Sequence, residues 1–194
     1  MPSDHLLRTL AAVPHGNTVL ELGCGHARHT VPLLRLGFDV YACDVDEQAV
    51  THARGQVLDH LHPEDATRRI THTSRFGALG YPDAHFDWIV AYDAYDDVSS
   101  KDDLLEALRE ARRVLKPGGW LYVAVRAVPS DFNPRSEEAE YASDSGPQFS
   151  YTEDTLTEVM AEAGLALAEY PHRTTADRPR LEAIYRRVDA GTPV

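Results

Sequence analysis

The sequence has little cysteine, little lysine and no long apolar run. Among its 194 residues there are 2 cysteines, Cys24 and Cys43, and the only lysines are Lys101 and Lys116. So few cysteines argue against a disulfide-rich secreted scaffold. No stretch approaches the roughly 18 consecutive apolar residues of a membrane-spanning helix, and the first residues lack the pattern of a secretory signal. We therefore expect a soluble, cytoplasmic protein without a membrane partner.

Positive charge is scarce as well. The chain carries 19 Lys and Arg against 31 Asp and Glu, which gives a formal net charge of −12. Such a field repels nucleic-acid phosphates, so nucleic acid is not an expected partner. The 10 histidines include the pairs His26 with His29 and His60 with His62, but no cluster of the three or four ligands that a metal site needs. No metal is therefore expected.

Apolar runs alternate with helical patterns from residue 18 to about residue 125, which is typical of βα units that build a parallel sheet. The expected strands are 18–22, 38–43, 69–73, 86–91 and 120–125, followed by an edge hairpin of 165–170 and 181–187. The expected helices are 29–35, 47–60, 101–115 and 152–164. The length suits one hydrophobic core, so residues 1–194 are expected to form a single domain.

Residues 126–150 interrupt this rhythm with prolines, glycine and many Ser, Asp and Glu residues. We expect an irregular segment here, and a loop of this length in a compact domain is usually functional. It is the candidate for a substrate lid, although its polar composition suits a disordered insertion equally well. The side chains that could contact a ligand are Phe132, Tyr141, Phe149 and Tyr151.

The most informative string is VLELGCGHAR, residues 19–28, in which a strand runs into a Gly23-Cys24-Gly25 turn before a helix. Glycines let the backbone turn tightly and approach a ligand, and a helix N-terminus offers free N–H groups. Asp44 ends the next strand, about 20 residues further on, where doubly wound folds place the acid that binds ribose hydroxyls. The spacing predicts a nucleoside site.

Several segments in order resemble the class I S-adenosylmethionine-dependent methyltransferases over most of the chain. They are the turn motif from Glu21 to Gly25, Asp44, the strand FDWIV at 86–90 and the turn LKPGGWL at 115–121. The resemblance implies an α/β fold: a Rossmann-like, doubly wound sheet of seven strands, mostly parallel with the last antiparallel, in a three-layer α/β/α sandwich. It also implies S-adenosylmethionine as the methyl donor.

Carried over position by position, the resemblance implies a set of cofactor-binding residues. The glycine turn and His26 would border the methionine part, while Asp44 and Val45 would hold ribose and flank adenine. Glu21 would orient the turn, or only cap its strand. The full implied set is Glu21, Gly23, Cys24, Gly25, His26, Asp44, Val45, Ser74, Arg75, Phe76 and Tyr92.

Two positions depart from the family pattern. Ala27 stands where a glycine is common. At the end of the third strand, where many members have an acid that accepts from the adenine amino group, this sequence has Ser74-Arg75-Phe76. An arginine cannot accept a hydrogen bond. Either Ser74 or a backbone group reads adenine while Phe76 packs against it, or the register differs.

After the fourth strand, Tyr92-Asp93-Ala94-Tyr95-Asp96-Asp97 brings acids and aromatic rings to the edge where the methyl group would emerge. Carboxylates and aromatic faces stabilise a sulfonium, and Asp96 and Asp97 could attract a cationic acceptor; a solvated acidic loop is the alternative. Methyl transfer is a direct displacement that needs alignment more than a base. The candidate catalytic residues are Asp93, Asp96 and Tyr92.

The sequence therefore predicts an S-adenosylmethionine-dependent methyltransferase that acts on a small-molecule acceptor, with the acceptor atom and the oligomeric state left open. A non-catalytic module that binds S-adenosylmethionine or S-adenosylhomocysteine is the alternative. A nicotinamide-dependent oxidoreductase ranks last, because its fingerprint requires a glycine where Arg28 stands.

Overall fold

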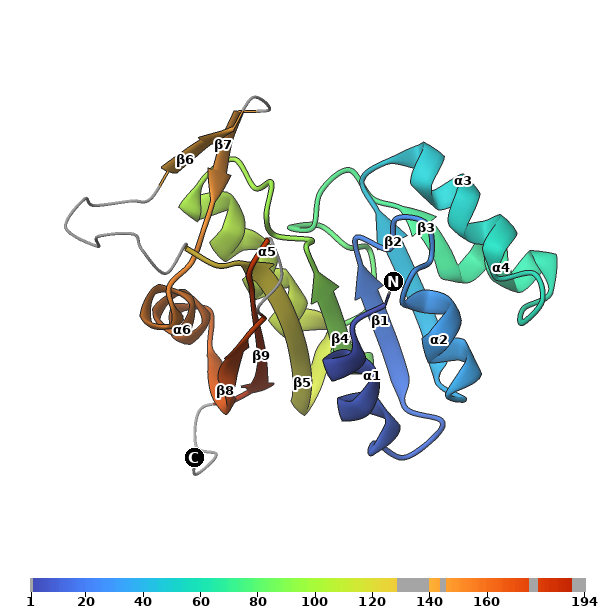
Figure 1. Cartoon of the computed structure of the whole chain (residues 1–194). Coiled ribbons are helices and arrows are strands. Elements are labelled where there is room, and N and C mark those ends of the chain that lie inside the picture. The colour runs from blue at the N-terminus through green and yellow to red at the C-terminus, as the bar shows by residue number, and fades with distance from the viewer. Residues whose placement is uncertain (1, 129–139, 144–145, 175–177, 190–194) are drawn as a thin grey trace.

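The computed structural model describes residues 2–128, 140–143, 146–174 and 178–189. Its centre is a seven-stranded sheet with the order β3-β2-β1-β4-β5-β9-β8 (Figure 1). The first five strands run parallel, and β9 is antiparallel to both β5 and β8. The strands are β1 Thr18–Leu22, β2 Asp39–Asp44, β3 Ile70–His72, β4 Phe86–Tyr92, β5 Leu115–Arg126, β8 Leu165–Arg173 and β9 Arg180–Arg187. The predicted fold class and the predicted edge hairpin are confirmed.

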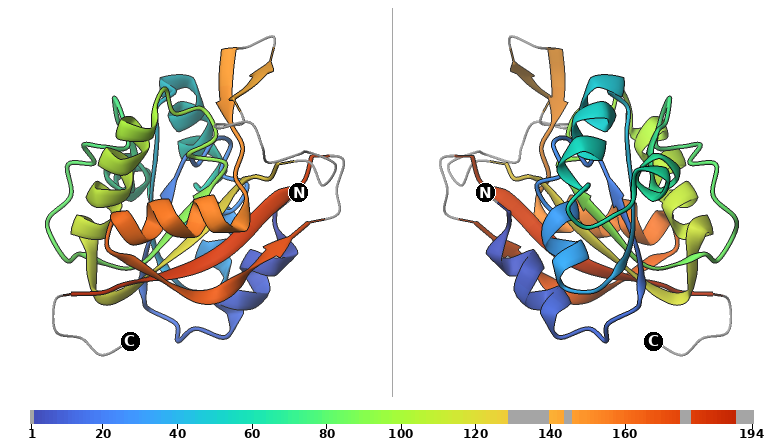
Figure 2. Two further views of the ribbon diagram at one scale, coloured as in Figure 1. Left: turned by 90° about the vertical axis from the view of Figure 1, so that its left-hand side faces the viewer. Right: turned by 90° about the vertical axis from the view of Figure 1, so that its right-hand side faces the viewer.

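Helices cover both faces of the sheet (Figure 2). One apolar core lies between the sheet and the helices α5 (Lys101–Val114) and α6 (Glu153–Glu162). A second lies under α1 (Asp4–Ala11) and α2 (Thr30–Arg35), and a third lies where α3 (Glu47–Gln56) and α4 (Pro63–Arg69) meet β2 and β3. The layers are therefore α/β/α.

The alternation of side chains along β1 explains how one strand serves two cores. Leu20 and Leu22 pack under α5 and α6, whereas Val19 packs on the opposite face under α1 and α2. Successive residues of a strand point to opposite faces, and both faces are covered here. The strand is therefore apolar on both sides, except at Thr18 where it begins and at Glu21.

Several predicted elements differ in the structure, and β5, predicted at 120–125, begins at Leu115. The predicted helix 47–60 ends at Gln56, and α4, which the sequence reading missed, begins at Pro63. His62 before it is extended, as the residue before a proline prefers. Helix α1, with its Ser3 N-cap, was also missed. The segment 126–150 is not irregular throughout, because β6 (Glu140–Ser143) and β7 (Gly146–Phe149) pair as an antiparallel hairpin.

None of the helices in the described ranges is both long and apolar enough to span a bilayer.

Candidate functional site

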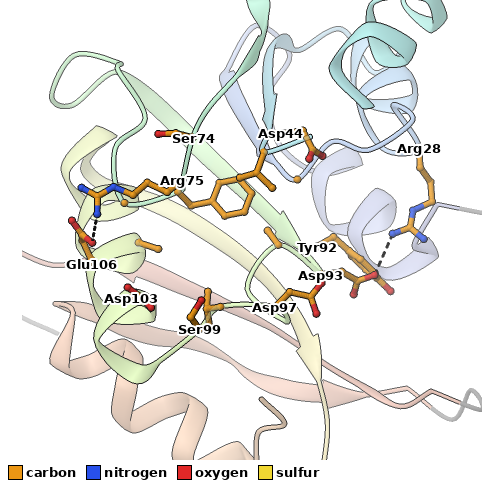
Figure 3. Close-up of a pocket in the computed structure, with 17 residues that line it drawn as sticks. Arg28, Asp44, Ser74, Arg75, Tyr92, Asp93, Asp97, Ser99, Asp103 and Glu106 are labelled. Carbon is orange, nitrogen blue, oxygen red and sulfur yellow. Dashed lines mark hydrogen bonds and ion pairs between the residues drawn. The ribbon is translucent and has the colours of Figure 1, made fainter. Parts of the chain in front are cut away.

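A cavity opens at the carboxyl ends of β1, β2 and β4, where parallel α/β sheets bind ligands (Figure 3). Its volume is about 540 Å³, within the range of small-molecule sites. The loop after β3 and the first turns of α5 complete its wall. The side chains labelled in Figure 3 are Arg28, Asp44, Ser74, Arg75, Tyr92, Asp93, Asp97, Ser99, Asp103 and Glu106.

The glycine turn forms one side of this cavity. Gly23 and Gly25 have φ of +68° and +51°, a region that favours glycine. A Cβ at Gly23 would lie 3.2 Å from Ala94 Cβ, whereas nothing lies within 4 Å of one at Gly25. The turn is thus tightly packed on one side and open on the other.

The turn does not lead directly into a helix. Ala27 has φ of +60° and α2 begins only at Thr30, because a left-handed residue interrupts helical hydrogen bonding. The left-handed conformation also explains why a glycine suits this position. The N–H groups of Gly23 and Cys24 donate to Cys43 O, and that of Gly25 to Asp44 Oδ2. The N–H groups of these three turn residues are therefore bonded within the protein.

Asp44 lies at the tip of β2 and lines the cavity although only 8% of its surface is exposed. Its Oδ2 accepts from Gly25 N at 2.7 Å and its Oδ1 from Asp46 N at 3.0 Å. Each carboxylate oxygen accepts more than one hydrogen bond, so both keep capacity for a ligand. Val45, next in sequence, lines the cavity as an apolar side chain that is 49% exposed.

Glu21 lies beneath the turn, outside the cavity lining, and is buried. Its Oε2 accepts from Thr30 Oγ1 at 2.5 Å, and its Oε1 is 3.4 Å from His29 Nδ1. Because His29 Nε2 accepts from Ser3 N at 3.3 Å, the ring proton of a neutral His29 belongs on Nδ1, facing Glu21. Glu21 therefore fastens the start of α2 to β1.

Three other predicted cofactor residues lie behind or beside the lining. Cys24 is buried against α3, and its burial, followed by the charges of Glu21 and Asp44, raises the pKa of the thiol. His26 stacks on His52 with 4.2 Å between ring centroids. Gly25 reaches the site through its bond to Asp44.

Tyr92 ends β4, and its ring forms part of the cavity wall. The Arg28 guanidinium lies 5.0 Å from the ring centroid, and the His29 ring packs at 4.8 Å. The Tyr92 hydroxyl donates to Glu182 Oε1 at 3.1 Å. Burial and the neighbouring Glu182 carboxylate raise the pKa of Tyr92 to about 12, so the hydroxyl stays protonated at neutral pH.

Glu182 of β9 is the buried centre of a set of polar contacts, here called the Glu182 network. The network is made of Ser3, His5, Tyr92, Tyr122 and Glu182. Glu182 is 2% exposed and accepts from Tyr122 Oη at 2.6 Å and from Ser3 Oγ at 3.3 Å. His5 Nδ1 lies 3.2 Å from its Oε2. These contacts join α1, β4, β5 and β9. Sequence reasoning missed Glu182, whose only signal is one acid within the apolar run LEAIY.

Asp93 and Asp96 follow β4 and pair with arginines. Asp93, with φ of +63°, lines the cavity. It lies 3.6 Å from Arg28 Nη2 and 2.7 Å from Arg180 Nε. Asp96 is 3% exposed and lies outside the lining, where it accepts from Arg126 N at 2.9 Å and is 3.2 Å from Arg180 Nη1. Burial raises the pKa of Asp96 to about 6, although Arg126 and Arg180 oppose the shift.

Ser74, Arg75 and Phe76, which follow β3 and were predicted as cofactor residues, all line the cavity. Arg75 turns its guanidinium toward α5, where Nη1 lies 2.9 Å from Glu106 Oε2 (Figure 3). Phe76 packs edge-on against Tyr95, with 6.3 Å between centroids. Arg28 and Glu106 are cavity residues that the sequence reading did not assign.

Two remaining predictions concern metals and the lid. In the described part of the chain, no three His, Cys, Asp or Glu side chains are grouped as a metal site. Tyr151 is buried and packs in the core with α6. Phe132 lies outside the described residues, as do the side chains of Tyr141 and Phe149, so the lid stays a prediction.

Comparison with known proteins places the chain in a family. Residues 20–123 match a family of methyltransferase domains. A ubiquinone biosynthesis O-methyltransferase from Caulobacter vibrioides is 35% identical over 114 residues, which cover 56% of this chain and 40% of the relative. The chain therefore belongs to the methyltransferase-domain family, which confirms the predicted resemblance. It spans less than half the length of that relative.

Solved structures agree on the fold. An S-adenosylmethionine-dependent methyltransferase from Methanosarcina mazei superposes with a TM-score of 0.77 at 14% identity, covering 97% of this chain and 99% of the other. A Burkholderia thailandensis 1,6-didemethyltoxoflavin-N1-methyltransferase, solved with its acceptor and S-adenosylhomocysteine, gives 0.72 at 19% identity and covers 94% and 78%. At these identities the likeness concerns the fold.

Proposed function

We propose that this protein binds S-adenosylmethionine in the cavity and transfers its methyl group to a small-molecule acceptor. The observation that carries the proposal is the placement of Gly23, Asp44 and Val45 around one cavity at the carboxyl ends of β1 and β2. A carboxylate with spare acceptor capacity beside an exposed apolar side chain suits a ribose with its attached base. Membership of the methyltransferase-domain family gives the reaction class.

Different cavity residues contact different parts of the ligand. Asp44 accepts from the ribose hydroxyls, and Val45 and Phe76 cover the faces of the base. Arg28 supplies a cation for the methionine carboxylate at the start of the turn that precedes α2. The bound cofactor supplies an electrophilic methyl group on a sulfonium. The electron-rich face of Tyr92 and the Asp93 carboxylate stabilise that positive charge.

The chain contributes alignment more than proton transfer. Tyr92 donates its only hydroxyl proton to Glu182 and has a raised pKa, which makes it a poor general base. Asp96 faces arginines outside the cavity lining. Asp93 is the predicted catalytic group best placed to accept a proton, and a direct displacement can proceed without one.

The surroundings of the cavity favour a neutral or cationic small acceptor. Its two arginines, Arg28 and Arg75, both pair with carboxylates, and the chain has a net charge of −12. A polyanionic acceptor would meet repulsion both at the cavity and across the surface. The proposed function involves neither a membrane nor a nucleic acid.

Titration calorimetry with S-adenosylmethionine, S-adenosylhomocysteine and NADH tests the proposal. We expect both sulfur nucleosides to bind and NADH not to bind. Transfer of a labelled methyl group to a panel of phenols, amines and thiols then tests catalysis. Binding without transfer to any acceptor class would favour the non-catalytic module, and failure of both sulfur nucleosides to bind would overturn the site.

A further inference from the structure

The polar face of α5 is fastened to the loop after β3. Arg75 Nη1 lies 2.9 Å from Glu106 Oε2, Leu79 N donates to Glu110 Oε1 at 2.9 Å, and Arg113 Nη2 donates to Tyr81 O at 2.8 Å. Residues three and four apart share a helix face, so Glu106, Glu110 and Arg113 act as one row. This row fixes Glu106 at the end where α5 meets the cavity.

Gly77 leaves the space in which the Glu106 carboxyl group lies. A Cβ at Gly77 would be 2.9 Å from both Cγ and Cδ of Glu106 and 3.2 Å from its Oε2. Any side chain at this position would therefore push the carboxylate away from the loop. Both Gly77 and Glu106 line the cavity.

The same end of the cavity suits the base of a bound nucleoside. Val45 directly follows Asp44, so a base attached to a sugar held by Asp44 lies beside Val45. Val45 and Phe76 offer apolar surface to its faces, and its edge then meets the loop after β3 and the start of α5. Adenine presents an amino group at its edge, which is a hydrogen-bond donor and needs an acceptor.

The side chains at that edge differ in what they offer. Arg75 can only donate. Asp103 is engaged in the N-cap of α5, where its Oδ2 accepts from Ser100 Oγ at 2.8 Å. Glu106 meets Arg75 through Oε2, and its carboxylate retains further acceptor sites.

We propose that Glu106 recognises the amino group of adenine and so supplies, from α5, the carboxylate that the end of β3 lacks. Arg75 orients this carboxylate, and Gly77 leaves the space that it occupies. The inference rests on the proposed function, since it assumes a nucleoside in the cavity. It makes Glu106 a specificity-determining residue for adenine over a 6-oxopurine, whose oxygen would face the carboxylate oxygens.

The test compares the affinities of S-adenosylhomocysteine and S-inosylhomocysteine, which carries a carbonyl in place of the amino group. We expect the wild-type protein to prefer the adenine compound by roughly tenfold or more, the effect of one charge-assisted hydrogen bond. Glu106→Gln should reduce this ratio to about threefold or less, because an amide both accepts and donates. Gly77→Ala should reduce it too, by displacing the carboxylate without removing it.

The matched control is Asp102→Asn, which removes the same charge from the same helix at an exposed residue outside the cavity lining. It should keep the wild-type ratio, with thermal unfolding confirming that every variant is folded. An unchanged ratio in Glu106→Gln, with S-adenosylhomocysteine still bound by the wild type, would overturn this inference alone. Absence of binding by the wild type would instead overturn the proposed function.

Discussion

The two sides of the cavity are held together in different ways. On the side of β1 and β2, the turn at Gly23–Gly25 is joined to the end of β2 by its own backbone N–H groups, two of which donate to Cys43 O and one to Asp44 Oδ2. On the side of β4 and β9, Tyr92 and Asp93 are held by side chains that come about 90 residues later in the sequence, namely Glu182 at 3.1 Å and Arg180 at 2.7 Å. The first side is a property of a local motif, and the second depends on the whole sheet.

This difference predicts where substitutions affect folding and where they affect binding. Buried carboxylates on the β4 side have several polar partners each, so losing one leaves other buried groups without partners. Asp44 on the β2 side accepts from the backbone N–H groups of half-buried Gly25 and exposed Asp46, and it faces the cavity. Changes on the β4 side should therefore destabilise the protein, and changes on the β2 side should mainly weaken ligand binding.

The largest expected effect is that of Glu182→Ala. It removes the acceptor of the Tyr92, Tyr122 and Ser3 hydroxyls from a buried site. Leaving buried donors unpaired costs about 1–3 kcal/mol each, so the free energy of unfolding in urea should fall by about 3 kcal/mol or more. Glu169→Ala, on the exposed edge of β8, is the control and should stay within about 0.5 kcal/mol of wild type. Equal losses of unfolding free energy in both variants would show that the buried contacts of Glu182 do not stabilise the protein.

The next largest expected effect is the pH dependence of stability to which Asp96 contributes. Burial raises its pKa from 3.8 to about 6, so the folded state holds this proton more tightly than the unfolded chain. The Asp96 contribution to stability is therefore full below about pH 4, falls as pH rises to about 6, and stays low above that. The difference in unfolding free energy between wild type and Asp96→Asn should fall by on the order of 2 kcal/mol across this window. A constant difference would show that Asp96 titrates normally.

On the β2 side, Asp44→Ala should weaken S-adenosylhomocysteine binding by about 1–3 kcal/mol, because it removes the acceptor for the ribose hydroxyls. Asp46→Ala is its control, since Asp46 only caps α3 through Gln48 N. That variant should lose about 1 kcal/mol of stability with its affinity unchanged in calorimetry. If Asp44→Ala bound as tightly as wild type, the ribose assignment would be wrong.

The smallest expected effect separates two roles of the Glu182 network, which are to stabilise the fold and to support the cavity. Tyr92→Phe and Tyr122→Phe each remove one hydroxyl that donates to Glu182, and each should cost about 1 kcal/mol of stability. Only Tyr92 lines the cavity, so only its variant should change the rate of methyl transfer. A similar change of rate in both variants would show that the network acts on the site as a whole.

The same contrast explains what could be predicted from the sequence. Gly23, Gly25 and Asp44 follow one another at a spacing set by one βα unit, so a local pattern locates them. Glu182 meets Tyr92 only because β9 inserts between β5 and β8, and no spacing in the chain indicates that. Glu106 reaches the cavity because α5 has one particular rotation about its axis, which the contact of Glu110 with Leu79 fixes.

The helices that were missed had weak local signals. Helix α1 has 8 residues and α4 has 7, too short for the helical period to stand out from background. Ser3 as an N-cap, with Leu6 and Leu10 four residues apart, could have indicated α1. Pro63 at the first turn could have indicated α4.

The buried cysteines beside the glycine turn provide a natural reporter of its motion. Burial raises the pKa of both Cys24 and Cys43, and alkylating reagents attack the thiolate of an accessible cysteine. Labelling can therefore proceed only during excursions in which the segment around the turn opens. The rate of iodoacetamide labelling thus measures how often this region opens, without an engineered probe. A nucleoside that bridges β1 and β2 should slow this labelling.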